Sequence, residues 1–125
     1  MTKVLAVACG GALGSLGRYL IAVAADRIST LNFPIGTFTV NVIGSLVIGF
    51  CWSYFDRTHI SNEFRLFIFT GFLGGFTTFS TFTRETVQFL KANEPFHAIS
   101  YLLASNVIGL TAVILGFYMS HRILR

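Results

Sequence analysis

The stretch around residues 71–83 holds the side chains best suited to bind an ion. Two adjacent glycines, Gly74 and Gly75, precede a run rich in hydroxyl groups, which comprises Thr77, Thr78, Ser80, Thr81 and Thr83. Each glycine weakens a helix by about 1 kcal/mol relative to alanine, and Ser and Thr side chains compete for backbone hydrogen bonds. The pattern predicts a helix that breaks near 74–78, with the glycines at the junction and with freed backbone groups that line a cavity or bind an ion. A continuous helix rich in hydroxyl groups is the alternative.

Isolated polar side chains in apolar sequence are the other candidates. The Asn41 amide could bond a neighbouring helix or donate to an anion. Tyr101 and Ser105 are four residues apart and would share one face of a helix, whereas Asn106 would point elsewhere. Arg18 lies inside an apolar segment. Its side chain would extend to the charged end of that segment, or it would stand as a cation at a pore mouth.

Residues for catalysis are lacking. The sequence has no pair of carboxylates placed for acid–base work, no nucleophile beside a base and no phosphate-binding loop. Glu85 follows Arg84, so a local ion pair or an interface carboxylate is expected. Cys9 and Cys51 lie in apolar runs without metal-ligand spacing and are expected to act as small buried hydrophobic residues. Lys and Arg are scattered rather than clustered, which argues against nucleic-acid binding.

The elements that position these residues are apolar enough to lie in lipid. Hydrophobic residues make up 54% of the 125-residue chain and charged residues 11%, whereas a soluble domain carries about 25% charged residues. This composition excludes an ordinary soluble domain and a disordered chain. A membrane-spanning helix needs about 20 mainly apolar residues. We therefore predict a single all-α integral membrane domain over residues 1–125, with spans at 4–25, 37–55, 64–90 and 96–120.

Small residues predict where these helices touch. They recur on one face of the first span (Gly10, Gly14 and Gly17) and of the second (Gly44 or Ser45, with Gly49). In lipid, close approach of backbones at small residues drives helix association, because burial from water no longer contributes. The pattern predicts a packed bundle and by itself indicates no function.

Four spans place both chain ends on one side of the membrane. The Lys and Arg residues then divide five to four, with Lys3, Arg57, Arg65, Arg122 and Arg125 on the side of the termini and Arg18, Arg27, Arg84 and Lys91 toward the other. Orientation normally follows an imbalance of Lys and Arg in short loops. The near-even division permits insertion in both orientations, and hence an antiparallel homodimer. A single orientation set by another cue is equally compatible with the count.

Three motifs resemble those of the Fluc/CrcB fluoride channels. The string GFLGGFTTFSTF at residues 71–82 closely resembles the signature of that family. Gly36-Thr37 with Val40-Asn41 resembles its second-span motif, and the glycines of residues 10–14 with Arg18-Tyr19 resemble the first. The resemblance covers all four spans and the whole length of the chain.

The resemblance implies an assembly larger than one chain. Members of the family are antiparallel dual-topology homodimers with two fluoride pores, embedded in membrane lipid. A structural sodium ion, which is not transported, is held on the two-fold axis by backbone carbonyls at the break in the third span. By position these carbonyls belong to Gly74 and Thr77. Carbonyl oxygens are hard ligands and suit a hard cation such as sodium.

The resemblance also implies a course for the pore. It places Asn41, Phe79, Ser80, Thr81, Phe82, Tyr101 and Ser105 along the pore, with Arg18 and Glu85 at the vestibule or pore mouth. An aromatic ring has a positive edge, so Phe edges can contact a small anion without a charge that would trap it. One departure stands out, because the positions one and two turns after Ser105 are Gly109 and Val113. The fourth spans of the family often carry further hydroxyl groups there.

The expected function is passive export of cytoplasmic fluoride through the bacterial inner membrane, which confers fluoride resistance and involves no enzymatic step. The main alternative is a small multidrug-resistance-type transporter, which is also a four-span dual-topology dimer. Such a transporter needs a carboxylate within its first span, and residues 4–25 contain no Asp or Glu. A subunit that only assembles, without transport, would leave the paired glycines and the hydroxyl run unexplained.

Overall fold

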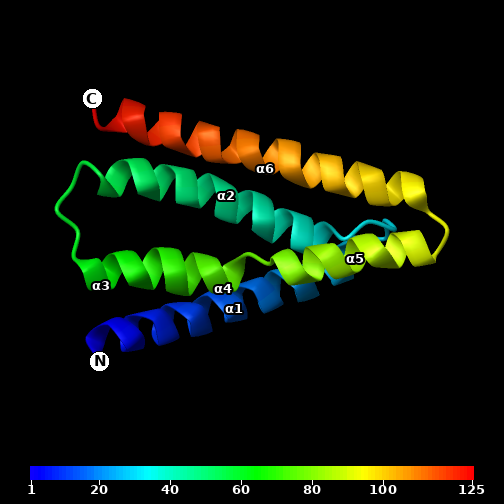
Figure 1. Cartoon of the computed structure of the whole chain (residues 1–125), viewed down its shortest axis with the longest axis horizontal. Helices are drawn as coiled ribbons and strands as arrows, with labels where there is room; N and C mark the ends of the chain where they lie inside the picture. Colours follow the sequence, from blue (N-terminus) through cyan, green and yellow to red (C-terminus); the bar gives the residue numbers. More distant parts are fainter.

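Four long helical segments cross the bundle in alternating directions, with both chain ends at the same end (Figure 1). The structure, a computed structural model, describes all residues from Met1 to Arg125. Its helices are α1 (Thr2–Ile28), α2 (Ile35–Phe55), α3 (Asn62–Arg65), the π-helix η1 (Leu66–Leu73), α4 (Gly74–Phe76), α5 (Phe79–Lys91) and α6 (Pro95–Ile123). The elements from α3 to α5 follow one another as the third segment, and each of the four segments is long and apolar enough to cross a membrane. The predicted all-α fold with four apolar helical segments is confirmed.

The third segment breaks two residues later than its glycines suggested. Gly74 is helical, with φ −63° and ψ −37°. The chain becomes extended only at Thr77 (φ −85°, ψ 156°) and Thr78 (φ −146°, ψ 123°). The two threonines end and restart the helix with their own hydroxyl groups. Thr77 Oγ1 donates to the Leu73 carbonyl at 2.9 Å, and Thr78 Oγ1 accepts from the Thr81 N–H at 3.2 Å as the N-cap of α5.

Glycines bring helix backbones into direct contact, as their spacing predicted. A Cβ atom added at Gly14 of α1 would lie 2.0 Å from the Phe72 carbonyl oxygen of η1. A Cβ atom added at Gly49 of α2 would lie 2.1 Å from the Val113 carbonyl oxygen of α6. Neither distance is possible for real atoms, so only glycine permits the packing at these positions.

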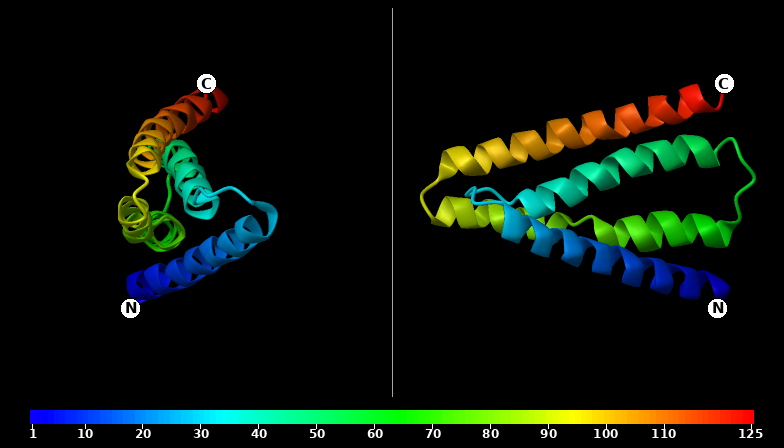
Figure 2. Two further views of the ribbon diagram at one scale, coloured as in Figure 1. Left: turned by 90° about the vertical axis from the view of Figure 1, so that its right-hand side faces the viewer. Right: turned by 180° about the vertical axis from the view of Figure 1, so that it is seen from behind.

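The helices form two pairs that meet mainly at the end of the bundle opposite the termini. The helix α2 packs along α6, and α1 packs along η1 and α4 (Figure 2). At the end opposite the termini, Phe82, Phe89, Ala98 and Tyr101 form the buried cluster that joins α5 to α6. Most other large apolar side chains remain exposed on the outside of the bundle, as expected for a surface in contact with lipid.

Candidate functional site

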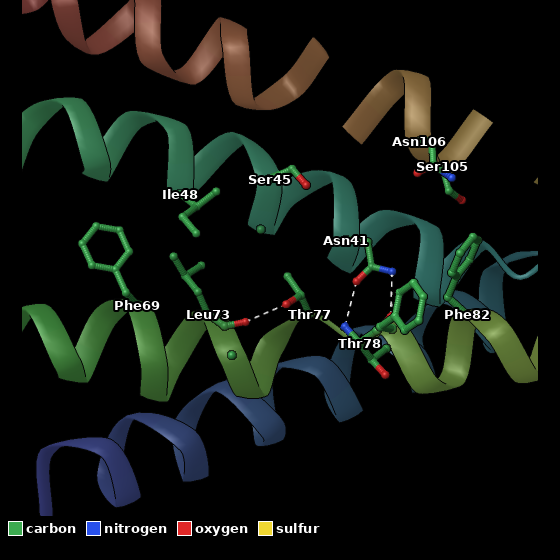
Figure 3. A pocket seen from close by; sticks show the side chains of 13 residues that line it. Asn41, Ser45, Ile48, Phe69, Leu73, Thr77, Thr78, Phe82, Ser105 and Asn106 are labelled. Carbon is green, nitrogen blue, oxygen red and sulfur yellow. Dashed lines mark hydrogen bonds between the residues drawn. The ribbon is translucent and has the colours of Figure 1, made fainter. Parts of the chain in front are cut away.

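Asn41 clamps the break in the third segment. Its side chain accepts a hydrogen bond from the Thr78 N–H at 2.8 Å and donates one to the Thr78 carbonyl at 3.0 Å (Figure 3). Because one partner is a donor and the other an acceptor, the orientation of the amide is fixed. Of the two roles foreseen for this residue, the structure contains the bond to a neighbouring helix. The second N–H of the amide has no partner among the bonds of the chain, so it stays available to an anion.

The N-terminus of α5 begins at the same point. Thr78 caps this helix, and its hydroxyl group lies 3.2 Å from Thr81 Oγ1 and 3.4 Å from Ser80 Oγ. A helix N-terminus carries the positive end of the helix dipole together with unpaired N–H groups. The hydroxyl-rich turn that includes Ser80 and Thr81 therefore creates a local environment that attracts anions without a formal positive charge.

A cavity of about 390 Å³ lies between α2, α6 and the broken helix (Figure 3). Its lining consists of Asn41, Gly44, Ser45, Ile48, Phe69, Leu73, Gly74, Thr77, Thr78, Phe79, Phe82, Ser105 and Asn106. Six of the predicted site residues thus line one space, namely Asn41, Gly74, Thr77, Phe79, Phe82 and Ser105. The cavity contains amide and hydroxyl groups among apolar side chains, and no ionisable side chain lines it.

The two phenylalanines after the break differ in exposure. Phe82 is 6% exposed, whereas Phe79 is 76% exposed in the single chain. Their ring centroids lie 5.9 Å apart, with 52° between the ring planes. Phe82 also meets Tyr101 edge-on, at a centroid distance of 5.0 Å and an angle of 71°. Phe82 is therefore held in position by its neighbours, while the open side of Phe79 faces away from the chain.

Tyr101 and Ser105 occupy different surroundings although they share a face of α6. Tyr101 is fully buried behind Phe82 and does not line the cavity, and its hydroxyl group has no hydrogen-bond partner. Ser105 does line the cavity, and its buried hydroxyl group also lacks a partner. The Ser105 hydroxyl group therefore has donor capacity left for a ligand in the cavity, whereas Tyr101 is closed off from it.

Glu85 bonds to a helix other than its own. Thr37 Oγ1 donates to the Glu85 carboxylate at 2.6 Å and so links α2 to α5. Of the two expectations for Glu85, a local ion pair or an interface carboxylate, the ion pair with Arg84 is not formed. Thr37 and Glu85 line a second cavity of about 300 Å³, together with Asp26, Thr81 and Arg84. This cavity lies at the end of the bundle opposite the termini.

Arg18 contacts the break instead of extending to the end of its own helix. Its Nε donates to the Gly75 carbonyl at 3.0 Å, and the residue is partly buried. The sequence offered two readings of this residue, the charged end of the segment and a pore mouth, and neither foresaw this bond. The guanidinium group supplies the donor that the Gly75 carbonyl would otherwise lack where the helix ends.

The carbonyls of Gly74 and Thr77 lack their usual helical donors. In a continuous helix the Thr78 N–H would bond the Gly74 carbonyl, but it bonds Asn41 instead. Likewise, the Thr81 N–H would bond the Thr77 carbonyl, but it bonds Thr78 Oγ1. Backbone carbonyl oxygens without donors are ligands that suit a small hard cation.

Ser45 and Asn106 also line the cavity, although they were not among the predicted pore residues. Ser45 is four residues after Asn41, so a search for polar residues one turn from Asn41 would have found it. Asn106 was expected to point away from the stripe formed by Tyr101 and Ser105. It lies at the cavity edge, where its amide donates to the Leu102 carbonyl of its own helix at 2.8 Å.

Comparison with known proteins gives a consistent result. The model of the family described as CrcB-like protein, Camphor Resistance (CrcB), matches residues 5–117. The fluoride-specific ion channel FluC of Desulfotalea psychrophila is 51% identical over 121 residues, which cover 97% of this chain and 94% of that protein. The FluC proteins of Phocaeicola vulgatus and Parabacteroides distasonis are 42% and 43% identical, and the matches cover 96% and 99% of this chain and 99% and 97% of those proteins.

The matches extend over nearly the whole chain and include all four apolar helical segments and the break. They therefore concern the complete membrane domain and not a shared fragment. The chain belongs to the CrcB family of membrane proteins.

Proposed function

We propose that this protein is a fluoride-specific channel of the cell membrane, through which cytoplasmic fluoride leaves passively down its electrochemical gradient. The observation that carries the proposal is the cavity at the helix break, whose polar lining consists of neutral donors. The relatives at 42–51% identity bear the name fluoride-specific ion channel. Such a channel carries out no chemical conversion, in agreement with the lack of a catalytic constellation in the sequence.

The lining suits rapid passage of a small anion. Conduction requires binding strong enough for entry and weak enough for exit. The free N–H of Asn41 and the hydroxyl group of Ser105 can replace lost water molecules one at a time. The edge of Phe82 adds a weak positive potential, and the N-terminus of α5 adds a partial one. A buried Lys or Arg in the cavity would hold the ion too tightly.

We further propose that the working unit is an antiparallel homodimer with dual topology. The face of the chain next to the break supports this proposal, because Phe79 is 76% exposed there and Gly74 is also exposed. A second, inverted copy would cover this face and close the open side of the cavity. The near-even division of basic residues between the two ends permits the inverted insertion.

Within that dimer, the carbonyls of Gly74 and Thr77 from each copy would hold a structural sodium ion. The fit is supported by the missing helical donors of both carbonyls and by the exposure of Gly74. The neighbouring Gly75 carbonyl is already bonded by Arg18 and is not part of the set. A cation there would neutralise the carbonyl dipoles at the interface and would take no part in conduction.

Fluoride efflux from liposomes that contain the purified protein tests the function. A potassium ionophore lets potassium leave with the anion, so that no membrane potential builds up to stop the efflux. A fluoride electrode should then record rapid efflux, and a chloride electrode should record almost none. Absence of fluoride efflux from monodisperse protein would overturn the assignment. Complete replacement of sodium by a large organic cation tests the metal site separately. It should abolish efflux and loosen the dimer, and unchanged efflux would refute the sodium proposal alone.

A further inference from the structure

The polar lining of the cavity becomes sparse on the side toward the chain termini. Beyond Asn41 the cavity is bordered by the apolar side chains of Ile48, Phe69 and Leu73 (Figure 3). Ser45 and Thr77 also lie on this side, but the Thr77 hydroxyl group is already bonded to the Leu73 carbonyl. The side-chain oxygen of Asn41 and one N–H of its side-chain amide are already bonded to the backbone of Thr78. An ion that moves past Asn41 in this direction therefore needs another donor, because a fluoride ion without water or a donor is too costly in an apolar space.

The helix α6 offers no donor at the required position. One turn after Ser105 stands Gly109, which has no side chain. A Cβ atom added there would meet a single neighbour within van der Waals range, the hydroxyl oxygen of Ser45, at 3.7 Å. The Ser45 hydroxyl group of α2 thus lies across from the gap that the glycine leaves in α6.

The hydroxyl groups of Ser45 and Ser105 are free to donate. Thr111 of α6 donates its hydroxyl group to the Val107 carbonyl one turn earlier, at 2.7 Å. By contrast, Ser105 Oγ is buried without a partner. No hydrogen bond joins Ser45 or Ser105 to another residue of the cavity (Figure 3).

We propose that Ser45 forms a fluoride-binding position in the half of the cavity toward the chain termini, where it stands in for the hydroxyl group that α6 lacks at Gly109. Ser105 and Ser45 then act as successive donors on opposite walls, and the ion passes from α6 to α2 as it leaves Asn41. The inference rests on the proposed fluoride conduction. It explains how the pathway remains polar although the hydroxyl stripe of α6 ends after Ser105.

Moving the hydroxyl group from α2 to the facing position of α6 tests the inference. Ser45→Ala should lower fluoride efflux from liposomes about tenfold, the factor that corresponds to the loss of one hydrogen bond at a binding position. The double variant Ser45→Ala/Gly109→Ser returns a hydroxyl group to the same space from the opposite helix and should restore most of the efflux. The 3.7 Å contact at Gly109 leaves room for the added side chain.

The control is Thr111→Ala, which removes an exposed α6 hydroxyl group that is bonded to Val107 and lies outside the cavity. Its efflux should equal that of the wild type. Wild-type efflux from Ser45→Ala would overturn the inference, and so would a loss that the double variant does not recover, because that pattern indicates a packing role. Failure of the wild-type protein to conduct would overturn the proposed function instead, so the two failures are distinguishable.

Discussion

Removal of the Asn41 side chain should destabilise the protein as well as impair its transport. The amide makes two hydrogen bonds to the backbone of Thr78, at 2.8 and 3.0 Å. The variant Asn41→Ala leaves the Thr78 N–H without a partner in a partly buried position. The break offers this N–H no helical acceptor, whereas the Thr78 carbonyl, which loses its bond from Asn41, still faces the N–H groups of the first turn of α5.

The expected size of the effect follows from these two groups. An unsatisfied buried donor costs about 1–3 kcal/mol, which is the cost expected for the Thr78 N–H, and the Thr78 carbonyl loses less because α5 offers it another donor. Hydrogen bonds between helices in membranes average only about 0.6 kcal/mol, but there the unfolded state finds other partners. Taking the lower end of the first range, the midpoint of thermal unfolding in detergent should fall by roughly 5 °C or more.

Asn106→Ala is the matched control for this measurement. It removes an amide from the edge of the same cavity, but that amide bonds only the Leu102 carbonyl of its own helix. Loss of this bond should lower the midpoint by about 1 °C or less. If Asn41→Ala and Asn106→Ala had the same midpoint of thermal unfolding, the stabilising role of the Asn41 bonds at the break would be refuted, because the Thr78 backbone would then have other partners. Fluoride efflux from Asn41→Ala should also fall sharply, since the break would lose its fixed shape.

Two further substitutions test packing and the aromatic contact. Gly14→Ala should prevent correct folding, because the new Cβ would lie 2.0 Å from the Phe72 carbonyl oxygen. Gly11→Ala should be tolerated, because the nearest contact of its Cβ would be 3.9 Å. Size-exclusion chromatography compares the two variants, and a monodisperse Gly14→Ala protein would contradict the packing of α1 against η1. Phe82→Ile should reduce fluoride efflux at least about tenfold, because it removes the ring edge while keeping a large apolar side chain. Efflux equal to that of the wild type would show that the ring takes no part in conduction.

The four helical segments could be predicted from sequence because lipid imposes a simple requirement. A segment of about 20 apolar residues must form a helix to satisfy its backbone, and the composition between residues 4 and 120 meets it four times. The positions of close packing at Gly14 and Gly49 were also predictable, since only glycine permits contact between backbones. Local patterns suffice where one physical constraint dominates.

The details of the break could not be predicted in the same way. The intrinsic weakness of Gly74 and Gly75 pointed to the junction, yet both remain helical and Gly75 packs against α1. The break falls at Thr77 and Thr78 because Asn41, distant in sequence, binds the Thr78 backbone more effectively than a further turn of helix would. The bond from Arg18 to Gly75 also joins residues far apart in the chain. Such tertiary contacts override local propensity.

The hydrogen bonds at the break leave part of its backbone without partners in the single chain. Asn41, Arg18 and the threonine hydroxyl groups satisfy the backbone on the sides that face α1 and α2. The Gly74 and Thr77 carbonyls have no donor, and Gly74 is exposed. Acyl chains cannot satisfy a carbonyl group at membrane depth. A chain inserted alone would therefore bear this cost, and we infer that an inverted copy and a shared cation remove it. On this view the same helix break requires dimerisation and, through the N-terminus of α5, prepares the cavity for an anion.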